Sequence, residues 1–374
     1  MARVVNSPNR SSALLLRLCR AGSIPGFSNS TVEFGIKFIF GSAHLSIFPW
    51  RRIFVTTNPV ARSRSGPTSE TVIKNLQLIC ALLGLSLLGS GCSIKRMAVN
   101  RMGDALAASG TTFASDDDPE LVKAAVPFSL KLMESLLAES PVHEGLLRAA
   151  SSGFTQYSYA FVQQDADELE DTDFAAAQEM RARARRLYLR AQNYGLRGLD
   201  TRHDGFQAEL RANPKQAVAR LRKKDVPTAY WTAASWAAAI SLSKDDPEMI
   251  ADLPLVEALI DRSLELDESF DHGAIHTFLI TYEMARQGAP GEAAERAQKH
   301  FQRAMELSEG KLAGPLVSYA ESVMVQKQDQ EQFTALLEQA LAINPDEHVE
   351  FRLANLIMQR RARWLLSRTD ELFL

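Results

Sequence analysis

The sequence is poor in cysteine and has no apolar run long enough to span a membrane. Its 374 residues contain three cysteines, of which Cys92 is the last. No disulfide can therefore form within the part that follows Cys92. The 283 residues from Cys92 onward are enough to build a core, so the stability of this part must come from packing.

The sequence also lacks an excess of basic residues in this part. Ten of the 42 Lys and Arg and two of the 45 Asp and Glu lie in residues 1–91. Residues 92–374 therefore carry 32 basic and 43 acidic side chains. Because basic patches supply most of the affinity for nucleic acid, this balance argues against a nucleic-acid partner.

No catalytic constellation and no cofactor motif is present, so the sequence predicts a protein that is not an enzyme. His272 and His276 have a spacing that can bind a metal, but there is no third ligand nearby and no Glu between them as in zinc peptidases. A capping or solvated role is favoured for both. The acidic run 165–173 lacks the spacing and the Gly of a calcium loop, which favours a solvated loop.

The one strongly apolar stretch, residues 76–88, is about 13 residues long. A spanning helix needs about 20, whereas the apolar region of a secretory signal has this shorter length. Lys74 precedes it and Leu-Gly-Ser-Gly-Cys92 follows it, which resembles a bacterial lipobox. Gly89 stands where that motif usually has Leu. The alternative is an uncleaved anchor or a core helix.

The lipobox predicts lipidation of Cys92 after cleavage, and several acyl chains give stable anchoring. Ser93 then favours the outer membrane, on its periplasmic side, over the inner membrane. Such a signal begins near residue 72, at Val72 if translation starts there. Residues 1–71 have no helical period and scattered Pro, Ser and Arg; an organelle transit peptide fits an internal lipobox poorly.

We therefore expect three parts. Residues 1–71 are a disordered or misassigned extension, 72–91 are a lipoprotein signal peptide, and 92–374 are a helical domain.

The helical domain is dominated by good helix formers and has almost no strand-like alternation, which predicts an all-α fold. Asp118-Pro119-Glu120 is typical of a helix start. The residues after it that recur at helical spacing, and are expected to face the core, are Leu121, Ala125, Phe128, Leu132 and Leu136. The other expected helices begin at Ser140 or span 173–196, 205–212, 214–222, 226–242, 254–266, 273–287, 291–309, 315–326, 330–343 and 347–366.

Three later helices end alike, at 263–267, 304–308 and 340–345, with offsets of 41 and 36 residues. A tetratricopeptide repeat has about 34 residues, with a small residue in its second helix and a Pro after it. The ending Ala-Leu-Ala-Ile-Asn-Pro345 fits well and the others are degenerate. The sequence thus predicts an α-solenoid of helix pairs with degenerate tetratricopeptide-like repeats, whose stacking forms a concave surface.

Stretches along this domain resemble TatT, the family of T components associated with tripartite ATP-independent periplasmic (TRAP) transporters. They are VPFSLKLMESLLAESPVHEGLL (126–147), SGFTQYSYAFV (152–162), RARRLYLRAQNYGLRGL (183–199), AYWTAASWAAAISLSKDDP (229–247) and GPLVSYAESV (314–323). The resemblance implies a lipid-anchored helical protein, a homo-oligomeric (trimeric) ring, and a cleft and pore for a small hydrophobic or organic-acid ligand. The implied partner is the transporter's substrate-binding protein.

Aromatic residues are the candidate ligand contacts. Tyr230, Trp231 and Trp236 lie within seven residues and cannot share one helix face, so at least one leaves the main apolar stripe. Packing between helices and lining of a ligand cleft are both open, and Asp245 is a candidate polar contact. By resemblance, Ser318 and Tyr319 lie near the family's ligand path.

Tyr157, on the second helix, has the same two interpretations as these aromatics, and packing is favoured for it.

The favoured function is a periplasmic lipid-anchored repeat protein that binds a small organic ligand or the transporter's binding protein. The alternative is an envelope scaffold that binds proteins or peptides and has no small-molecule cavity. A closed apolar cavity favours the first interpretation, and an open polar groove favours the second. An enzyme is the remaining alternative, and would require convergent titratable groups in a pocket.

Overall fold

The computed structural model describes residues 91–108 and 110–373, without the side chains of 91–95 and 111. The chain divides into two units, Met1–Pro67 and Thr68–Leu374, and every described residue belongs to the second. The expectations for the extension and the signal peptide concern residues 1–91, of which only Gly91 is described. The side chain of Cys92 is likewise outside the described part, so its lipidation stays a prediction.

The regular elements of the described residues are all helices, without a strand, which confirms the all-α part of the predicted fold class. The helices of the first half are α2 (Gly91–Ala108), α3 (Gly110–Ala114), α4 (Pro119–Glu139), α5 (Glu144–Ser158), the π-helical turn η1 (Tyr159–Gln163), α6 (Gln164–Leu169), α7 (Phe174–Arg202), α8 (Phe206–Ala212), α9 (Pro214–Ala219), η2 (Lys223–Asp225) and α10 (Val226–Ser241).

The second half continues with helices of similar length. They are α11 (Pro247–Ile250), α12 (Leu253–Leu266), η3 (Phe270–Gly273), α13 (Ala274–Ala285), α14 (Ala293–Leu307), α15 (Ala313–Tyr319), the π-helical turn η4 (Ala320–Met324), α16 (Val325–Lys327), α17 (Gln330–Ala342), η5 (Val349–Phe351), α18 (Arg352–Ser367) and α19 (Thr369–Leu372).

Side-chain caps set several helix starts. The Asp118 carboxylate accepts from the backbone N–H groups of Glu120 and Leu121, at 3.1 and 3.0 Å, as the sequence predicts for α4. The start predicted at Ser140 is wrong by several residues. There the His143 ring accepts from the Leu146 N–H at 3.2 Å, and α5 begins after it.

Helix α7 continues to Arg202, past residue 196 where the sequence predicted its end, and it includes Gly195 and Gly198. A Cβ at Gly195 would lie 2.1 Å from Thr232 Oγ1, and one at Gly198 would lie 3.1 Å from Thr228 Cγ2. Both glycines therefore let α10 approach α7 closely. They serve packing between two helices rather than termination of one.

The predicted core face of α4 is wrong in part. Leu121 is 58% exposed and Phe128 is 73% exposed, although both have the helical spacing of core residues. The buried face instead contains Val122, Leu130 and Met133. Helix α4 thus has two apolar faces, and periodicity alone does not say which one packs.

The acidic run after α5 is not the solvated loop that its composition predicted. Its first part forms α6, and its carboxylates pair with arginines of α7 and α18. The bonds are Asp165 Oδ1–Arg360 Nη2 (2.8 Å), Glu168 Oε2–Arg360 Nη2 (2.6 Å), Asp167 Oδ1–Arg181 Nη2 (2.9 Å) and Asp167 Oδ2–Arg361 Nη1 (3.0 Å). These pairs connect the C-terminal helix to the first third of the domain.

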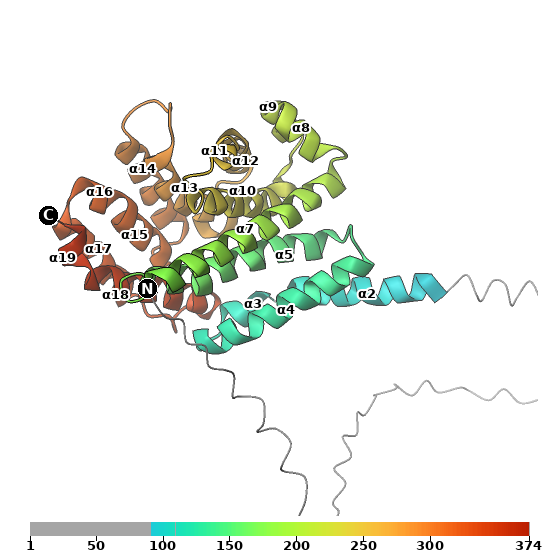
Figure 1. Cartoon of the computed structure of the whole chain (residues 1–374), viewed down its shortest axis with the longest axis horizontal. Helices are drawn as coiled ribbons and strands as arrows, with labels where there is room; N and C mark the ends of the chain where they lie inside the picture. The colour runs from blue at the N-terminus through green and yellow to red at the C-terminus, as the bar shows by residue number, and fades with distance from the viewer. Residues whose placement is uncertain (1–90, 109, 374) are drawn as a thin grey trace, which may run out of the picture. The chain divides into compact units, whose positions relative to one another are not determined.

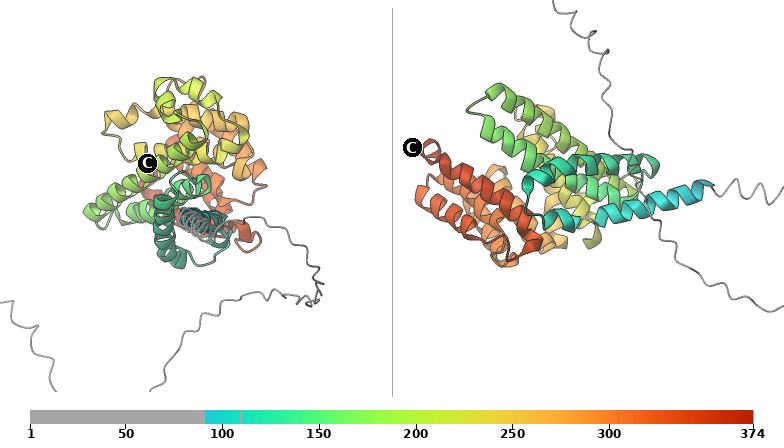
Figure 2. Two further views of the ribbon diagram at one scale, coloured as in Figure 1. Left: turned by 90° about the vertical axis from the view of Figure 1, so that its right-hand side faces the viewer. Right: turned by 90° about the horizontal axis from the view of Figure 1, so that it is seen from below.

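Consecutive helices pack on one another through most of the domain. Helix α7 contacts both α5 and α10, α10 contacts α12, and α13 pairs with α14, as Figure 1 shows. The exception is α18, which contacts α3 and α4 from the other end of the described chain as well as α15 and α17. The right-hand view of Figure 2 shows this C-terminal helix, in red, beside the blue-green N-terminal helices.

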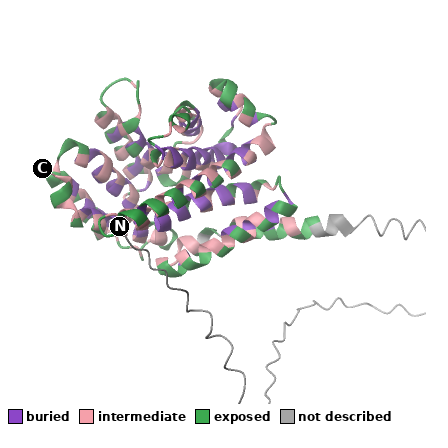
Figure 3. Cartoon of the chain, in the orientation of Figure 1, coloured by how far each residue is buried: buried purple, intermediate pink, exposed green. Residues whose placement is uncertain are grey.

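Three clusters of buried residues make up the core. One lies among α4, α5, η1, α7 and α18, a second among α7 to α10, α12 and α13, and a third among α13 to α18. Buried residues run along most of α10 in Figure 3. None of the helices in the described ranges is both long and apolar enough to cross a membrane.

Candidate ligand-binding site

An apolar cavity of about 390 Å³ opens within the first core cluster. Its walls come from the end of α2, from α3, α4 and α5, from the π-helical turn η1, and from α18. Many of the facing residues are small, and these are Ala107, Gly110, Ala114, Ala149, Gly153, Ala160 and Ala354. The cavity therefore exists because small residues of several helices meet where large ones would fill the space.

Larger apolar side chains complete the lining, and few polar ones interrupt it. The larger ones include Phe113 of α3, Met133 of α4, and Ile357 and Met358 of α18. This composition is typical of sites for small organic molecules, which are mostly apolar with a few placed polar groups. None of these four residues was predicted, because no local pattern links α3 with a helix some 240 residues later.

Arg148 is the one cationic residue in the lining, and it is exposed. It makes no ion pair with any other residue of the described chain. On α18, by contrast, Arg360 is neutralised by Asp165 and Glu168. An exposed guanidinium beside an apolar cavity fits a carboxylate, which arginine binds through two parallel hydrogen bonds.

Tyr157 is the one residue of the predicted ligand contacts that lines this cavity. It lies on α5 and is 8% exposed. Its ring is tilted against Phe161 with 5.8 Å between centroids, and the Arg183 guanidinium lies 5.9 Å from the ring centre. Tyr157 is held by packing and also lines the cavity, and its contact with a ligand stays a prediction.

The predicted aromatics of α10 lie in a different place, the second core cluster. Trp236 is 1% exposed, and Tyr230 is 8% exposed. The ring of Tyr230 packs edge-on against Trp231 at 4.9 Å and against Phe270 at 5.3 Å. Burial raises the pKa of Tyr230 well above its usual value. The structure does not bring these three residues to the cavity.

The remaining predicted contacts are also dispersed. Asp245 is exposed in the turn before α11. The N-cap of α11 is the next residue, Asp246, whose carboxylate accepts from the N–H groups of Glu248 and Met249. Ser318 and Tyr319 end α15 in the third cluster, where the Tyr319 ring stacks on Phe301 at 4.4 Å. Whether any of them contacts a ligand stays a prediction.

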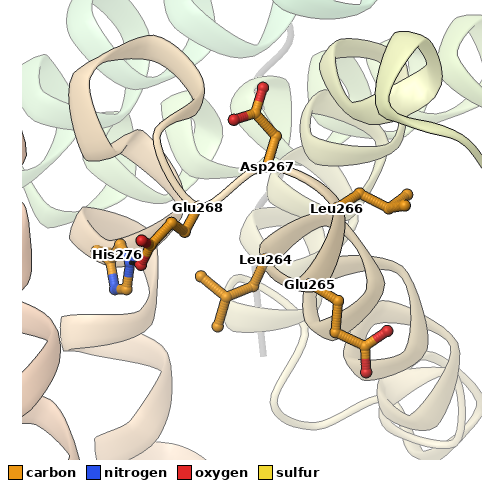
Figure 4. A pocket seen from close by; sticks show the side chains of 6 residues that line it. All are labelled: Leu264, Glu265, Leu266, Asp267, Glu268 and His276. Atoms are coloured by element: carbon orange, nitrogen blue, oxygen red, sulfur yellow. Dashed lines mark ion pairs between the residues drawn. The ribbon is translucent and has the colours of Figure 1, made fainter.

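A second, more open hollow of about 570 Å³ lies at the end of α12, and Figure 4 shows Glu268 and His276 side by side in it. His276 is 6% exposed, so the predicted solvated or capping role is wrong for this residue. Its Nδ1 lies 2.8 Å from Nδ1 of His300, and its Nε2 lies 3.5 Å from the Glu268 carboxylate. His272 points elsewhere, with its ring on Phe351 at 4.7 Å.

Burial and the neighbouring His276 lower the pKa of His300 to about 4, and burial also lowers the pKa of His276. The two rings are therefore a neutral pair at neutral pH, one nitrogen donating to the other. Over residues 91–373, without 109, no three or more His, Cys, Asp or Glu side chains are arranged to hold a metal ion. We assign this histidine pair to packing between α13 and α14.

Comparison with known proteins now identifies the family. The model of the TRAP transporter T-component family matches residues 115–373. This chain belongs to the TRAP transporter T-component family. It is also similar to an uncharacterised protein of Treponema pallidum (strain Nichols), with 29% identity over 318 residues that cover 80% of this chain and 98% of the relative.

Membership in the T-component family confirms the resemblance inferred from the sequence. It makes the chain an accessory component of a TRAP transporter, associated with the cell envelope. T components are not a known enzyme family. The family match includes α4, α5, η1 and α18, which form most of the cavity wall, and begins after α2 and α3.

Proposed function

We propose that this T component is a periplasmic lipoprotein that binds a small hydrophobic or organic-acid ligand in the cavity between α3, α4, α5 and α18. The observation that carries the proposal is the cavity itself, an apolar space of about 390 Å³ with a single unpaired arginine in its lining. Arg148 would hold the acid group, and the apolar walls would hold the rest of the ligand.

The proposal includes a lipid anchor on Cys92, more favourably in the outer membrane than in the inner one. Cys92 lies in the first turn of α2, and the other end of α2 supplies Leu106 and Ala107 to the cavity wall. An anchor at this position would hold the cavity close to the membrane surface. The substrate-binding protein of the transporter is the proposed protein partner, and a homotrimer is the proposed assembly.

We further propose that the helix pairs from α12 onward are degenerate tetratricopeptide repeats stacked as a solenoid. The pairing of α13 with α14 and of α15 with α17 supports this proposal. The similar sequence endings of α12, α14 and α17 support it as well. An envelope scaffold that uses these repeats to bind proteins is the second candidate function, and the same helix pairing favours it.

Blocking the cavity separates the two functions. Ala354 is an exposed lining residue of α18, so Ala354→Trp fills the cavity mouth at little cost to the fold. We expect protein purified gently from host membranes to retain a small ligand in native mass spectrometry, and the variant to lose it. Ala335→Trp, on an exposed position of α17, is the matched control and should keep the ligand.

The same spectra report the anchor, since acyl chains add a characteristic mass at Cys92. A wild-type protein that carries its lipid and a binding protein but no small molecule would favour the scaffold. A wild-type protein whose ligand is equally retained by the Ala354→Trp variant would show that the ligand lies elsewhere.

A further inference from the structure

A buried amide, that of Gln164, lies beside Tyr159, which lines the cavity, although Gln164 is not itself a lining residue. Gln164 is 1% exposed, and neither its Oε1 nor its Nε2 makes a hydrogen bond of normal geometry within the described residues. Burying an amide without hydrogen bonds is unfavourable, and native proteins rarely retain such a group without a reason. Gln164 is therefore a group that a ligand can satisfy.

Gln164 follows the π-helical turn that contributes Tyr159, Ala160 and Phe161 to the cavity lining. The Tyr159 hydroxyl donates only to Sδ of Met358, at 3.9 Å, and a thioether is a weak acceptor. Burial raises the pKa of Tyr159 to about 12, and a long, weak hydrogen bond with the neighbouring Gln164 side chain lowers it in part. Two polar groups with unused hydrogen-bonding capacity thus lie between η1 and α18, and π-helical turns recur at functional sites.

The charges around this end exclude an anion. Arg361 is the nearest cation, and it is already paired with Asp167 at 3.0 Å and with Glu321. The charge of Glu321 adds to the rise in the pKa of Tyr159, so the local field is not positive. An uncharged group that both donates and accepts hydrogen bonds suits Tyr159 and Gln164, whereas a carboxylate suits Arg148.

Arg148 and Tyr159 are 11 residues apart along α5 and its π-helical extension. At 1.5 Å per residue, the two positions are separated by about 16 Å along the axis. We infer that the ligand is an elongated apolar acid whose far end carries a hydroxyl or carbonyl group, bound by Tyr159 and Gln164 while its carboxylate lies at Arg148. This inference rests on the proposed function and names the class of ligand for the same cavity.

A matched pair of fatty acids tests the inference. Dodecanoate has a length similar to this separation, and its ω-hydroxy derivative adds only the terminal hydroxyl. We titrate each acid into the full-length protein, stripped of any bound lipid ligand, in a calorimeter. We expect the ω-hydroxy acid to bind about ten times more tightly than dodecanoate. A factor of ten in affinity corresponds to about 1.4 kcal/mol, which a hydrogen bond to a buried, unsatisfied amide can supply.

Gln164→Leu removes the amide and keeps the side-chain size. The variant should bind both acids equally, and it should unfold at a higher temperature than the wild type without ligand, because an unsatisfied buried group is gone. If the Gln164 amide instead stabilised the fold through its own hydrogen bonds, Gln164→Leu would unfold at a lower temperature than the wild type. Tyr159→Phe should reduce the preference for the hydroxy acid several-fold. Gln178→Leu, the same change at an exposed residue of α7 that does not line the cavity, is the control and should keep the full preference.

The outcomes separate this inference from the function on which it rests. If the wild type binds both acids equally, the inference is wrong and the carrier function stands. If the preference survives in Gln164→Leu, or if a crystal structure with the hydroxy acid shows only a water on Gln164, the inference is also wrong. If neither acid binds to the wild type while Ala354→Trp still loses a native ligand, the cavity binds another class of molecule. If neither acid binds and no native ligand depends on Ala354, both proposals fall.

Discussion

The first two core clusters of this T component use their side chains in opposite ways. The cluster around α10 contains three large aromatic residues within seven positions, and two of them are almost fully buried. The cluster among α4, α5, η1 and α18 presents alanines and glycines to one another and leaves a cavity. The aromatic residues of α10 therefore fill their space, and the candidate site lies where small residues of several helices leave a cavity.

The largest expected effect on stability comes from a substitution in the cluster around α10. Trp236→Ala should reduce the free energy of unfolding by about 3–5 kcal/mol, since it removes a buried indole and leaves a cavity. Denaturant titration measures this change. Ligand retention in native mass spectrometry should be unaffected in the protein that remains folded. A loss of ligand without a loss of stability would instead place Trp236 at the binding site. The ligand would then lie in the cluster around α10 and not in the cavity.

The next effect concerns the charges that connect α18 to the cavity cluster. Arg361 is 8% exposed and pairs with Asp167 and Glu321, and its removal leaves Glu321 unpaired and Asp167 with Arg181 alone. Because these carboxylates keep some contact with solvent, Arg361→Met should cost on the order of 2 kcal/mol in urea titration, less than a fully buried pair. Arg303→Met, at a surface pair with Glu268, should leave the stability unchanged. Equal effects of the two changes would mean that α18 is not held by these pairs.

The change from alanine to leucine should alter the free energy of unfolding in opposite directions in the two clusters. Ala149→Leu extends a side chain into the cavity and should raise the free energy of unfolding by up to about 1 kcal/mol. Ala233→Leu, at a fully buried position of α10, should lower it by about 1–3 kcal/mol through overpacking. The thermal unfolding midpoints of the two variants, compared with that of the wild type, measure these changes. Destabilisation by both would show that the cavity closes in solution.

The smallest effect is a dependence on pH from the neutral pair His276 and His300. The folded-state pKa of His300, about 4, lies below the usual value of 6.5, so the unfolded chain binds protons more readily. The free energy of unfolding should therefore fall as the pH is lowered from about 6.5 to about 4. Glu268, Glu283 and Arg303 face the same pair.

His300→Gln should flatten this part of the unfolding curve, measured as thermal midpoints at several pH values. His348→Gln, at a surface histidine whose side chain is 37% exposed, is the matched control. An unchanged slope in His300→Gln would assign the acid sensitivity to the carboxylates of the ion pairs instead.

Helix positions were predictable because they depend on local rules. N-caps such as Asp118 and Asp246 and the prolines after them precede the helices that the structure contains. The errors came from long-range contacts. Gly195 resembles a helix stop, but it lies within α7 because Thr232 of α10 packs against it. The acidic run resembles a solvated loop, but arginines from α18 neutralise it.

The candidate site was less predictable than the fold. Tyr157 was found because it recurs on the core face of its own helix, which is local information. Phe113, Met358 and Gln164 carry no such signal, since a cavity is defined by side chains that meet across helices and by hydrogen bonds that are missing. The aromatic segment of α10 drew attention by composition, and its burial follows from its size.

The sequence by itself determined the all-helical class, most of the helix starts and the family to which the chain belongs, because capping, periodicity and motif composition act over short distances. Only the tertiary structure decided which face of α4 is buried, which carboxylates are neutralised and where a cavity remains. These properties depend on the return of α18 to the first helices of the domain, and contacts between residues about 240 positions apart leave no trace in local spacing.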